Sequence, residues 1–193
     1  MAAKRWSDIM SNATFSGNPR TEWLSADGND RDMRVLEPFW FLDPAGRRWD
    51  VPAGTLINGA SIPRTLWSSV GSPYTGPYRR AAVVHDAVVG REGVLRSEAD
   101  AMFYFACLAG GCSLLQAKLL YAGVRVGSWS VSKQVFAHET AAALPDAQRL
   151  PGQLSASELE VRARYTLLAN QLLATPDSFP QIEAVVNQNL GTP

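Results

Sequence analysis

The chain has 193 residues, of which 46% are hydrophobic and 19% charged, a composition typical of a globular domain with its own core. Its 18 basic and 18 acidic side chains give a net charge of zero, which argues against nucleic-acid binding, because such binding needs a positive field over the phosphates. No apolar run approaches the roughly 20 residues that span a bilayer, so no membrane span is expected.

Residues 20–58 have the composition of short strands joined by turns. Apolar and aromatic residues fill 33–42, and a turn with Pro44 at its second position follows. Residues 47–57 then form a second predicted strand, which Pro52 interrupts. This pattern predicts an antiparallel β-hairpin or meander.

Residues 61–128 are predicted to be mainly helical. Three segments with helical apolar periodicity end at Gly90, at a pair of glycines and at Gly127, and the short links between them predict antiparallel packing. At the start of the second segment, Ser97 and Asp100 have the spacing of a capping box. We therefore expect a small helical bundle after the strands.

The last part of the chain predicts two further helices. One begins at a capping box formed by Ser155 and Glu158, and a shorter one follows near the C-terminus. Their apolar faces require packing on the main domain or on a partner. The predicted fold class is α+β, a small antiparallel β-hairpin or meander followed by a helical bundle with an added C-terminal helical region. The predicted organisation is an N-terminal arm at 1–19, an α+β domain at 20–130 and a helical extension at 131–193.

Ser61 lies in the stretch NGASIPRTLW and is either a nucleophile or a helix cap. The nucleophile elbow of hydrolases has the pattern G-x-S-x-G, but Pro63 stands where the second glycine is needed. A serine followed by Ile-Pro is typical of a helix start, so we predict that Ser61 caps a short helix. Asn58 and Ser61 also remain candidates for lining a pocket, together with Tyr104.

His85 and Asp86 are polar residues inside an apolar helical segment, where an unpaired polar side chain costs several kcal/mol. Neighbours on a helix point about 100° apart, so these two cannot form a dyad with each other. Asp100 on the next helix is the best candidate for a further carboxylate. In a catalytic site His85 would be the general base, and Asp86 an orienting group or a metal ligand.

The alternative is structural. In that interpretation His85 and Asp86 satisfy loop backbone groups and nearby arginines, and Asp100 belongs to the capping box. No P-loop and no G-x-G-x-x-G motif is present, so no nucleotide cofactor is expected, whereas a divalent metal at Asp86 stays open.

Four blocks in this order resemble an uncharacterised phage and prophage family, "domain of unknown function one-three-five-three". The resemblance covers roughly residues 20–130 and implies a small α+β domain encoded by bacteriophages or by bacteria that carry them, with no established activity. Asn58 stands where the family commonly has Asp, and Ala87 where an aromatic residue often follows His-Asp, which weakens any metal or acid–base site there. The blocks are WDVPAGTLINGASIPRTLW, GPYRRAAVVHDAVVG, RSEADAMFYFACLAGG and LLYAGVRVGSW.

Two functions follow from these observations. The first is a virion component of the tail, neck or baseplate, structural or accessory, that contacts other phage structural proteins or associates with itself. The alternative is a hydrolase of the cell envelope, acting on peptidoglycan or lipid through a His-Asp site. The family setting implies synthesis in the host cytoplasm, with the virion as a further location.

The helical His-Asp pair is also similar to the arrangement in secreted phospholipases A2. In those enzymes the histidine activates water and the neighbouring aspartate helps to hold calcium. This chain lacks their glycine-rich calcium loop and their many disulfides, so the similarity is one of geometry alone.

Overall fold

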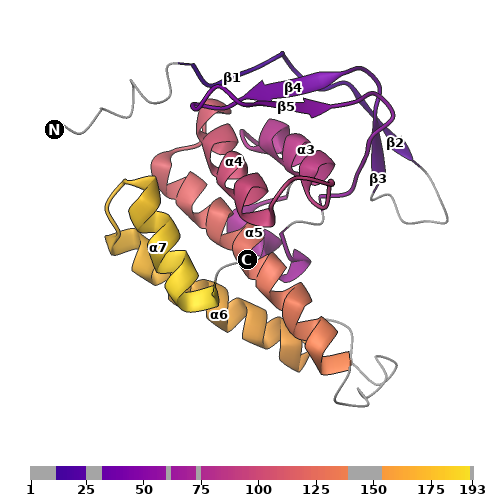
Figure 1. The fold of residues 1–193 in the computed structure, drawn as a ribbon. Helices are drawn as coiled ribbons and strands as arrows, with labels where there is room; N and C mark the ends of the chain where they lie inside the picture. Colours follow the sequence, from indigo (N-terminus) through magenta and orange to yellow (C-terminus); the bar gives the residue numbers. More distant parts are fainter. Residues whose placement is uncertain (1–11, 25–31, 60–61, 73–74, 139–153, 192–193) are drawn as a thin grey trace, which may run out of the picture.

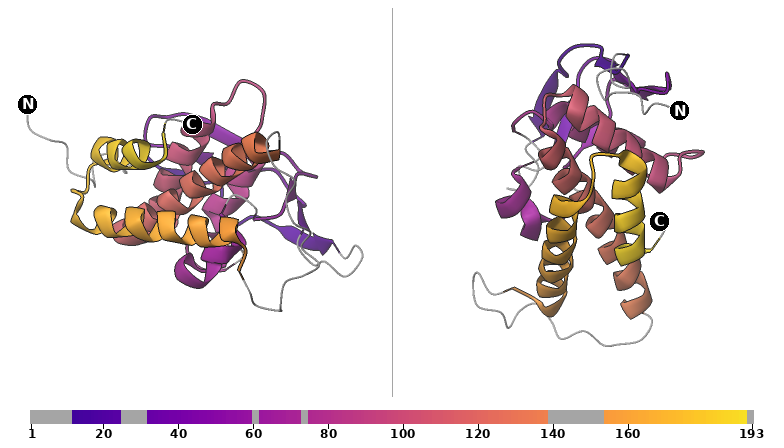
Figure 2. Two further views of the ribbon diagram at one scale, coloured as in Figure 1. Left: turned by 90° about the horizontal axis from the view of Figure 1, so that it is seen from below. Right: turned by 90° about the vertical axis from the view of Figure 1, so that its left-hand side faces the viewer.

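The computed structural model describes residues 12–24, 32–59, 62–72, 75–138 and 154–191. In these parts two small antiparallel sheets precede a group of packed helices, which confirms the predicted α+β class (Figure 1). The strands lie over α3 and α4, while α6 and α7 pack on the long helix α5 (Figures 1 and 2).

Each sheet has three strands. The first has the order β1-β4-β5, and the second has the order β2-β3-β6. β4 and β5 form the predicted hairpin, in which Phe39 pairs with Val51 and Leu42 with Arg48. The strands are β1 (Thr14–Phe15), β2 (Thr21–Leu24), β3 (Asp32–Val35), β4 (Phe39–Leu42), β5 (Arg48–Val51) and β6 (Leu56–Ile57).

The hairpin turn is held by the carboxylate of Asp43. Its Oδ1 accepts hydrogen bonds from the backbone N–H groups of Ala45 and Arg47, each at 2.9 Å. Gly46 has a φ of 86°, a conformation that glycine adopts without strain. The predicted turn with Pro44 at its second position is therefore confirmed.

The apolar run 33–42 is divided between two strands. β3 and β4 belong to different sheets, and Pro38 lies between them, where its missing N–H cannot interrupt a ladder. Pro52 separates β5 from β6 in the same way. Proline therefore divides two predicted strands into four.

The helices follow the predicted order with different ends. The third predicted helix does not end at Gly127, because α5 continues to His138, beyond the domain boundary predicted at residue 130. A mid-helix glycine costs about 1 kcal/mol relative to alanine, and buried packing along α5 offsets that cost. The helices are η1 (Arg64–Leu66), α2 (Trp67–Val70), α3 (Arg79–Val88), α4 (Arg96–Ala109), α5 (Leu114–His138), α6 (Ala156–Ala174) and α7 (Phe179–Leu190).

Two of the three predicted helix starts change. The short helix begins at Arg64 with Pro63 at its N-cap position, so the predicted cap at Ser61 is wrong for this helix, and Ser61 itself lies outside the described residues. The capping box of α6 is confirmed, since the Glu158 N–H donates to Ser155 Oγ at 3.0 Å and the Ser155 N–H donates to Glu158 Oε2 at 2.7 Å. The third start, at α4, involves Asp100 and belongs to the candidate site.

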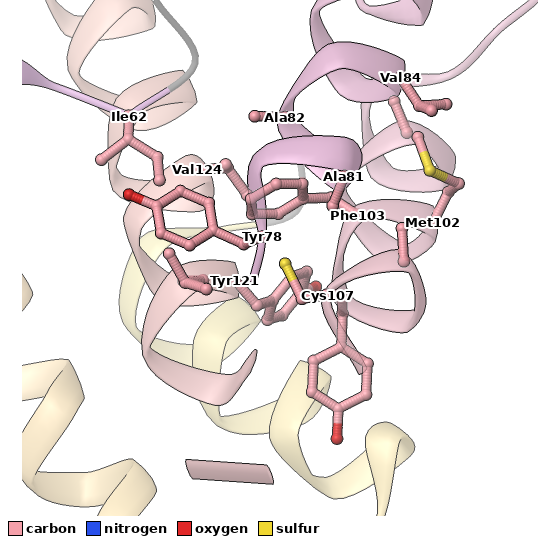
Figure 3. Packing of buried hydrophobic residues seen from close by; sticks show 14 of the residues in the cluster. Ile62, Tyr78, Ala81, Ala82, Val84, Met102, Phe103, Cys107, Tyr121 and Val124 are labelled. Carbon is pink, nitrogen blue, oxygen red and sulfur yellow. The ribbon is translucent and has the colours of Figure 1, made fainter. Parts of the chain in front are cut away.

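The main core lies between α3, α4 and α5. Figure 3 shows Ala81 of α3, Phe103 of α4 and Val124 of α5 directed toward one another, and all three are buried. α6 and α7 extend this core on the other side of α5, where Phe179 packs against Tyr121. None of the described helices has both the length and the apolar character that crossing a membrane requires.

Candidate functional site

His85 and Asp100 meet between α3 and α4. Both side chains are fully buried, and His85 Nε2 lies 2.7 Å from Asp100 Oδ1. The structure thus brings His85 together with Asp100, the carboxylate selected from the sequence. The predicted capping box of Ser97 and Asp100 is wrong, because Leu95 is the N-cap of α4 and no side chain caps it.

The Asp100 carboxylate joins four side chains from three helices. Arg96 Nε donates to Asp100 Oδ1 at 3.0 Å, and Arg125 Nε lies 3.7 Å from Oδ2. Ser128 Oγ donates to Oδ2 at 3.5 Å. A buried charge is tolerated when it is paired and hydrogen-bonded, and Asp100 meets both conditions.

Arg125 extends this network to the C-terminal helix. Its side chain is 2% exposed, and it donates to the Tyr121 hydroxyl at 3.0 Å. It also donates to Asn187 Oδ1 at 2.9 Å and to the Gly191 carbonyl at 3.0 Å. The network therefore connects the predicted α+β domain with α7.

The contact with Asp100 determines the tautomer of a neutral His85. Because an ionised carboxylate can only accept hydrogen bonds, the proton lies on Nε2 and the lone pair on Nδ1. Nδ1 is buried and has no hydrogen-bond partner among the described residues. The ring packs against Phe103, with 4.9 Å between the ring centroids. Within the described residues, His85 therefore holds a nitrogen lone pair that no donor occupies, beside the ring of Phe103.

Asp86 belongs to a different face of α3. Its Oδ2 accepts a hydrogen bond from the Gly59 N–H at 2.6 Å, so this carboxylate holds the loop that follows β6. Gly59 has a φ of 62°, which favours glycine at this position. Asp86 is half-buried and lines a pocket together with Asn58.

The pocket has a volume of about 520 Å³ and lies between β6, α3, α4 and α5. Two of its polar residues, Arg96 and Ser128, also contact Asp100, so the pocket wall is in direct contact with the buried His85 network. The lining residues are Leu56, Asn58, Asp86, Val89, Gly90, Val94, Arg96, Gly127, Ser128, Val131 and Ser132.

The structure thus separates the predicted site residues into three groups. Asn58 and Asp86 line the pocket, whereas His85 and Asp100 lie behind its wall. Tyr104 lies in the aromatic core against Phe179, 4.9 Å between centroids, and burial raises the pKa of its phenol. Ser61, the remaining pocket candidate, falls outside the described residues.

The sequence placed Arg96 among the arginines near His85 and Asp86, but it did not point to the other two residues of the site, Arg125 and Ser128. Arg96 lies four residues before Asp100 on α4, a spacing that places both side chains on one face of a helix. Arg125 is a charge within an apolar run, which is the same signal that identified His85. Nothing in the sequence pointed to Ser128 as a site residue, because the helix that carries it was predicted to end one residue earlier, at Gly127.

The metal proposed at Asp86 has few ligands in the described part of the chain. No group of three or more His, Cys, Asp and Glu side chains is placed there to hold an ion. Backbone carbonyl and side-chain amide oxygens also coordinate Ca²⁺, so Asn58 is a further candidate ligand beside Asp86. A metal at Asp86 stays a prediction.

Two curated relatives come from Sinorhizobium fredii (strain NBRC 101917 / NGR234). "Uncharacterized protein y4jT" is 34% identical over 124 residues, which cover 63% of this chain and 37% of the relative. "Uncharacterized protein y4iH" is 40% identical over 96 residues, which cover 49% of this chain and 40% of the relative. The chain thus spans less than half the length of these relatives.

No solved structure matches the chain. The sequence model of one family does match. The matched segment begins within β3, includes β4 to β6, α3 and α4, and ends within α5. His85, Asp86, Arg96 and Asp100 all lie inside that segment. The family resemblance noted from the sequence is therefore confirmed for residues 33–124, which match the family described as "Protein of unknown function (DUF1353)".

Proposed function

We propose that the domain is a hydrolase of the cell envelope, with His85 as general base and Asp100 as the residue that orients it. One observation carries the proposal: the 2.7 Å contact at Nε2, which leaves Nδ1 unpartnered among the described residues. An oriented imidazole with one unused nitrogen is the arrangement that general-base catalysis needs.

In this proposal His85 Nδ1 removes a proton from a water molecule as the water oxygen attacks an acyl carbon of the substrate. The imidazolium formed is stabilised by Asp100, and the proton then passes from Nδ1 to the leaving group. Asp86 holds the β6 loop through Gly59 and forms one wall of the pocket. His85, Asp100 and Asp86 therefore have separate roles in the proposed reaction.

The burial of His85 sets a condition on this mechanism. Its side chain is 1% exposed, so water and substrate reach Nδ1 only after a neighbouring segment moves. In other enzymes, loops or domains that move to admit a substrate then close over it and exclude bulk water. We therefore expect substrate binding to open the region between the pocket and His85.

The test is an assay of the purified chain on two substrates, phospholipid vesicles and peptidoglycan sacculi, each with and without Ca²⁺. A general base contributes about 10²- to 10⁴-fold to a rate, so His85→Gln should reduce hydrolysis by at least the lower factor. Measured release of fatty acid or of soluble peptidoglycan fragments gives the rate.

A second variant, Asp100→Asn, tests the residue that orients His85. Asp43→Asn is its matched control. Asp43 is also a buried carboxylate, but it holds the β-hairpin and accepts from the Trp49 indole at 2.9 Å. Only Asp100→Asn should abolish hydrolysis when both variants are assayed below their unfolding temperatures. An unchanged rate in His85→Gln, or no turnover of either substrate by the unmodified chain, contradicts the proposal.

A role as a phage virion component is the second candidate, favoured by the outer face of α6. Leu159, Leu167 and Leu173 are 55%, 51% and 61% exposed there, and this helix lies outside the segment that matches the family. Exposed apolar side chains on one helix are typical of a contact surface. The test is mass spectrometry of purified phage particles, in which a structural component is present at a fixed copy number and a host-cell enzyme is absent.

A further inference from the structure

We propose that the 520 Å³ pocket binds the headgroup of a zwitterionic phospholipid, with the phosphate at Arg96 and the ammonium group at Asp86. This inference rests on the proposed hydrolase only for the reaction that follows binding. It selects lipid rather than peptidoglycan as the substrate class.

Arg96 has the properties of an anion-binding residue. Its Nε is fixed by the fully buried Asp100 at 3.0 Å, while the side chain remains 30% exposed in the pocket wall. Within the described residues only Nε of this guanidinium is bonded, so both terminal NH₂ groups are available. A guanidinium held in this way can donate two parallel hydrogen bonds to a phosphate.

Asp86 supplies the opposite charge in the same pocket. One of its oxygens accepts from Gly59, which fixes the carboxylate on the wall formed by α3 and the β6 loop. Asp100 forms ion pairs with both Arg96 and Arg125, so these three side chains carry a net charge of +1, and Asp86 adds one negative charge in the pocket lining. A headgroup with one phosphate and one ammonium group matches this pair of charges.

The exposed part of the pocket lining combines apolar side chains with the polar residues Asn58 and Ser132. Leu56 and Val131 line the pocket and are 58% and 61% exposed, and Leu95, next to Arg96 in the chain, is 66% exposed. Val89 and Val94 add apolar surface to the walls. An acyl chain attached to the headgroup would remove this apolar surface from water, which is favourable, whereas a glycan strand would not.

The experiment measures binding without turnover, in the full chain carrying His85→Gln. Three probes are titrated by calorimetry: a short-chain phosphatidylethanolamine, a short-chain phosphatidylglycerol and a muramyl peptide. We expect the phosphatidylethanolamine to bind most tightly, Arg96→Ala to weaken both lipids by about tenfold or more, and Asp86→Asn to remove the preference for the zwitterion. Ser68→Ala, an exposed substitution on α2 outside the pocket, should change nothing.

Each contrary result has a distinct meaning. Tighter binding of the muramyl peptide than of either lipid, or lipid binding that Arg96→Ala leaves unchanged, overturns the inference. Lipid binding that responds to both variants, together with no hydrolysis by the unsubstituted chain, supports the inference and removes the proposed hydrolase instead.

Discussion

At the scale of single residues, Asp100 is the centre of the site. Its buried carboxylate balances Arg125, which is 2% exposed, and orients His85. Removing one partner of a buried ion pair costs about 3–5 kcal/mol, because the other charge stays buried and unpaired. Asp100→Asn should therefore lower the free energy of unfolding by about that amount, as measured by urea denaturation.

The comparison is again Asp43→Asn. The partners of Asp43 that the structure gives are backbone N–H groups and the Trp49 indole, all neutral donors. Loss of such hydrogen bonds costs about 1–3 kcal/mol. An Asp100→Asn variant no less stable than Asp43→Asn would show that Asp100 carries no buried ionic network.

These residues show how much of the site is predictable. His85, Asp86 and Asp100 could be selected from the sequence because polar residues in apolar helices need partners. The sequence could not predict that His85 and Asp100 form a buried pair while Asp86 lies in the pocket. That arrangement depends on how α3 and α4 face each other. Asp100 was also consistent with a capping box, since a spacing of three residues serves both a cap and an inward-facing side chain.

At the scale of elements, the link between α4 and α5 depends on Gly110. Its φ of −76° suits any residue, but a Cβ there would lie 2.5 Å from the Pro77 carbonyl oxygen. Backbone cannot yield as a flexible side chain does, so Gly110→Ala should destabilise the protein by about 1–3 kcal/mol. Thermal unfolding measures the difference.

Gly123→Ala is the paired substitution on α5. The new Cβ would lie 3.4 Å from Ile62 Cγ2, an ordinary contact with a side chain. Alanine is the better helix former by about 1 kcal/mol, so this variant should be unchanged or slightly more stable. Equal losses in both variants would contradict the close approach at Gly110.

The elements themselves were more predictable than their ends. The hairpin turn and the Ser155 cap follow from local chemistry, and both are confirmed. Past Gly127, half-buried Trp129 of α5 packs under the guanidinium of Arg164 of α6, a contact that no local pattern records. Tertiary packing thus decides where local signals compete.

At the scale of the whole molecule, polar contacts attach the C-terminal helices to α5. Lys118, 4% exposed, donates to the Thr175 carbonyl and to Asp177 Oδ1, each at 2.7 Å. A further contact joins α6 to η1, since Arg162 donates to Thr65 Oγ1 at 2.7 Å. We therefore expect α5, α6 and α7 to unfold in one transition with the remainder of the chain.

Buried phenols should make this transition sensitive to alkaline pH. Burial raises the pKa of Tyr121 and of Tyr165 to about 12. The folded state then keeps protons that the unfolded state loses above about pH 10, so this stabilisation is complete below pH 10 and is lost as the pH rises toward 12. The urea midpoint should fall steadily over that range.

Tyr165→Phe provides the check on this pH dependence. The variant has one buried phenol fewer, so its urea midpoint should fall less steeply with pH than that of the unmodified chain. Identical slopes would mean that the Tyr165 phenol ionises equally in both states.

The catalytic role of His85 is tested by the rate of fatty acid release from phosphatidylethanolamine vesicles. The unmodified chain is compared with His85→Gln, and circular dichroism spectra confirm that both are folded. We expect measurable release by the unmodified chain and a loss of about 10²-fold or more in the variant. Equal rates, or no release by either protein, would contradict a catalytic role for His85 and would leave its contact with Asp100 as part of the core.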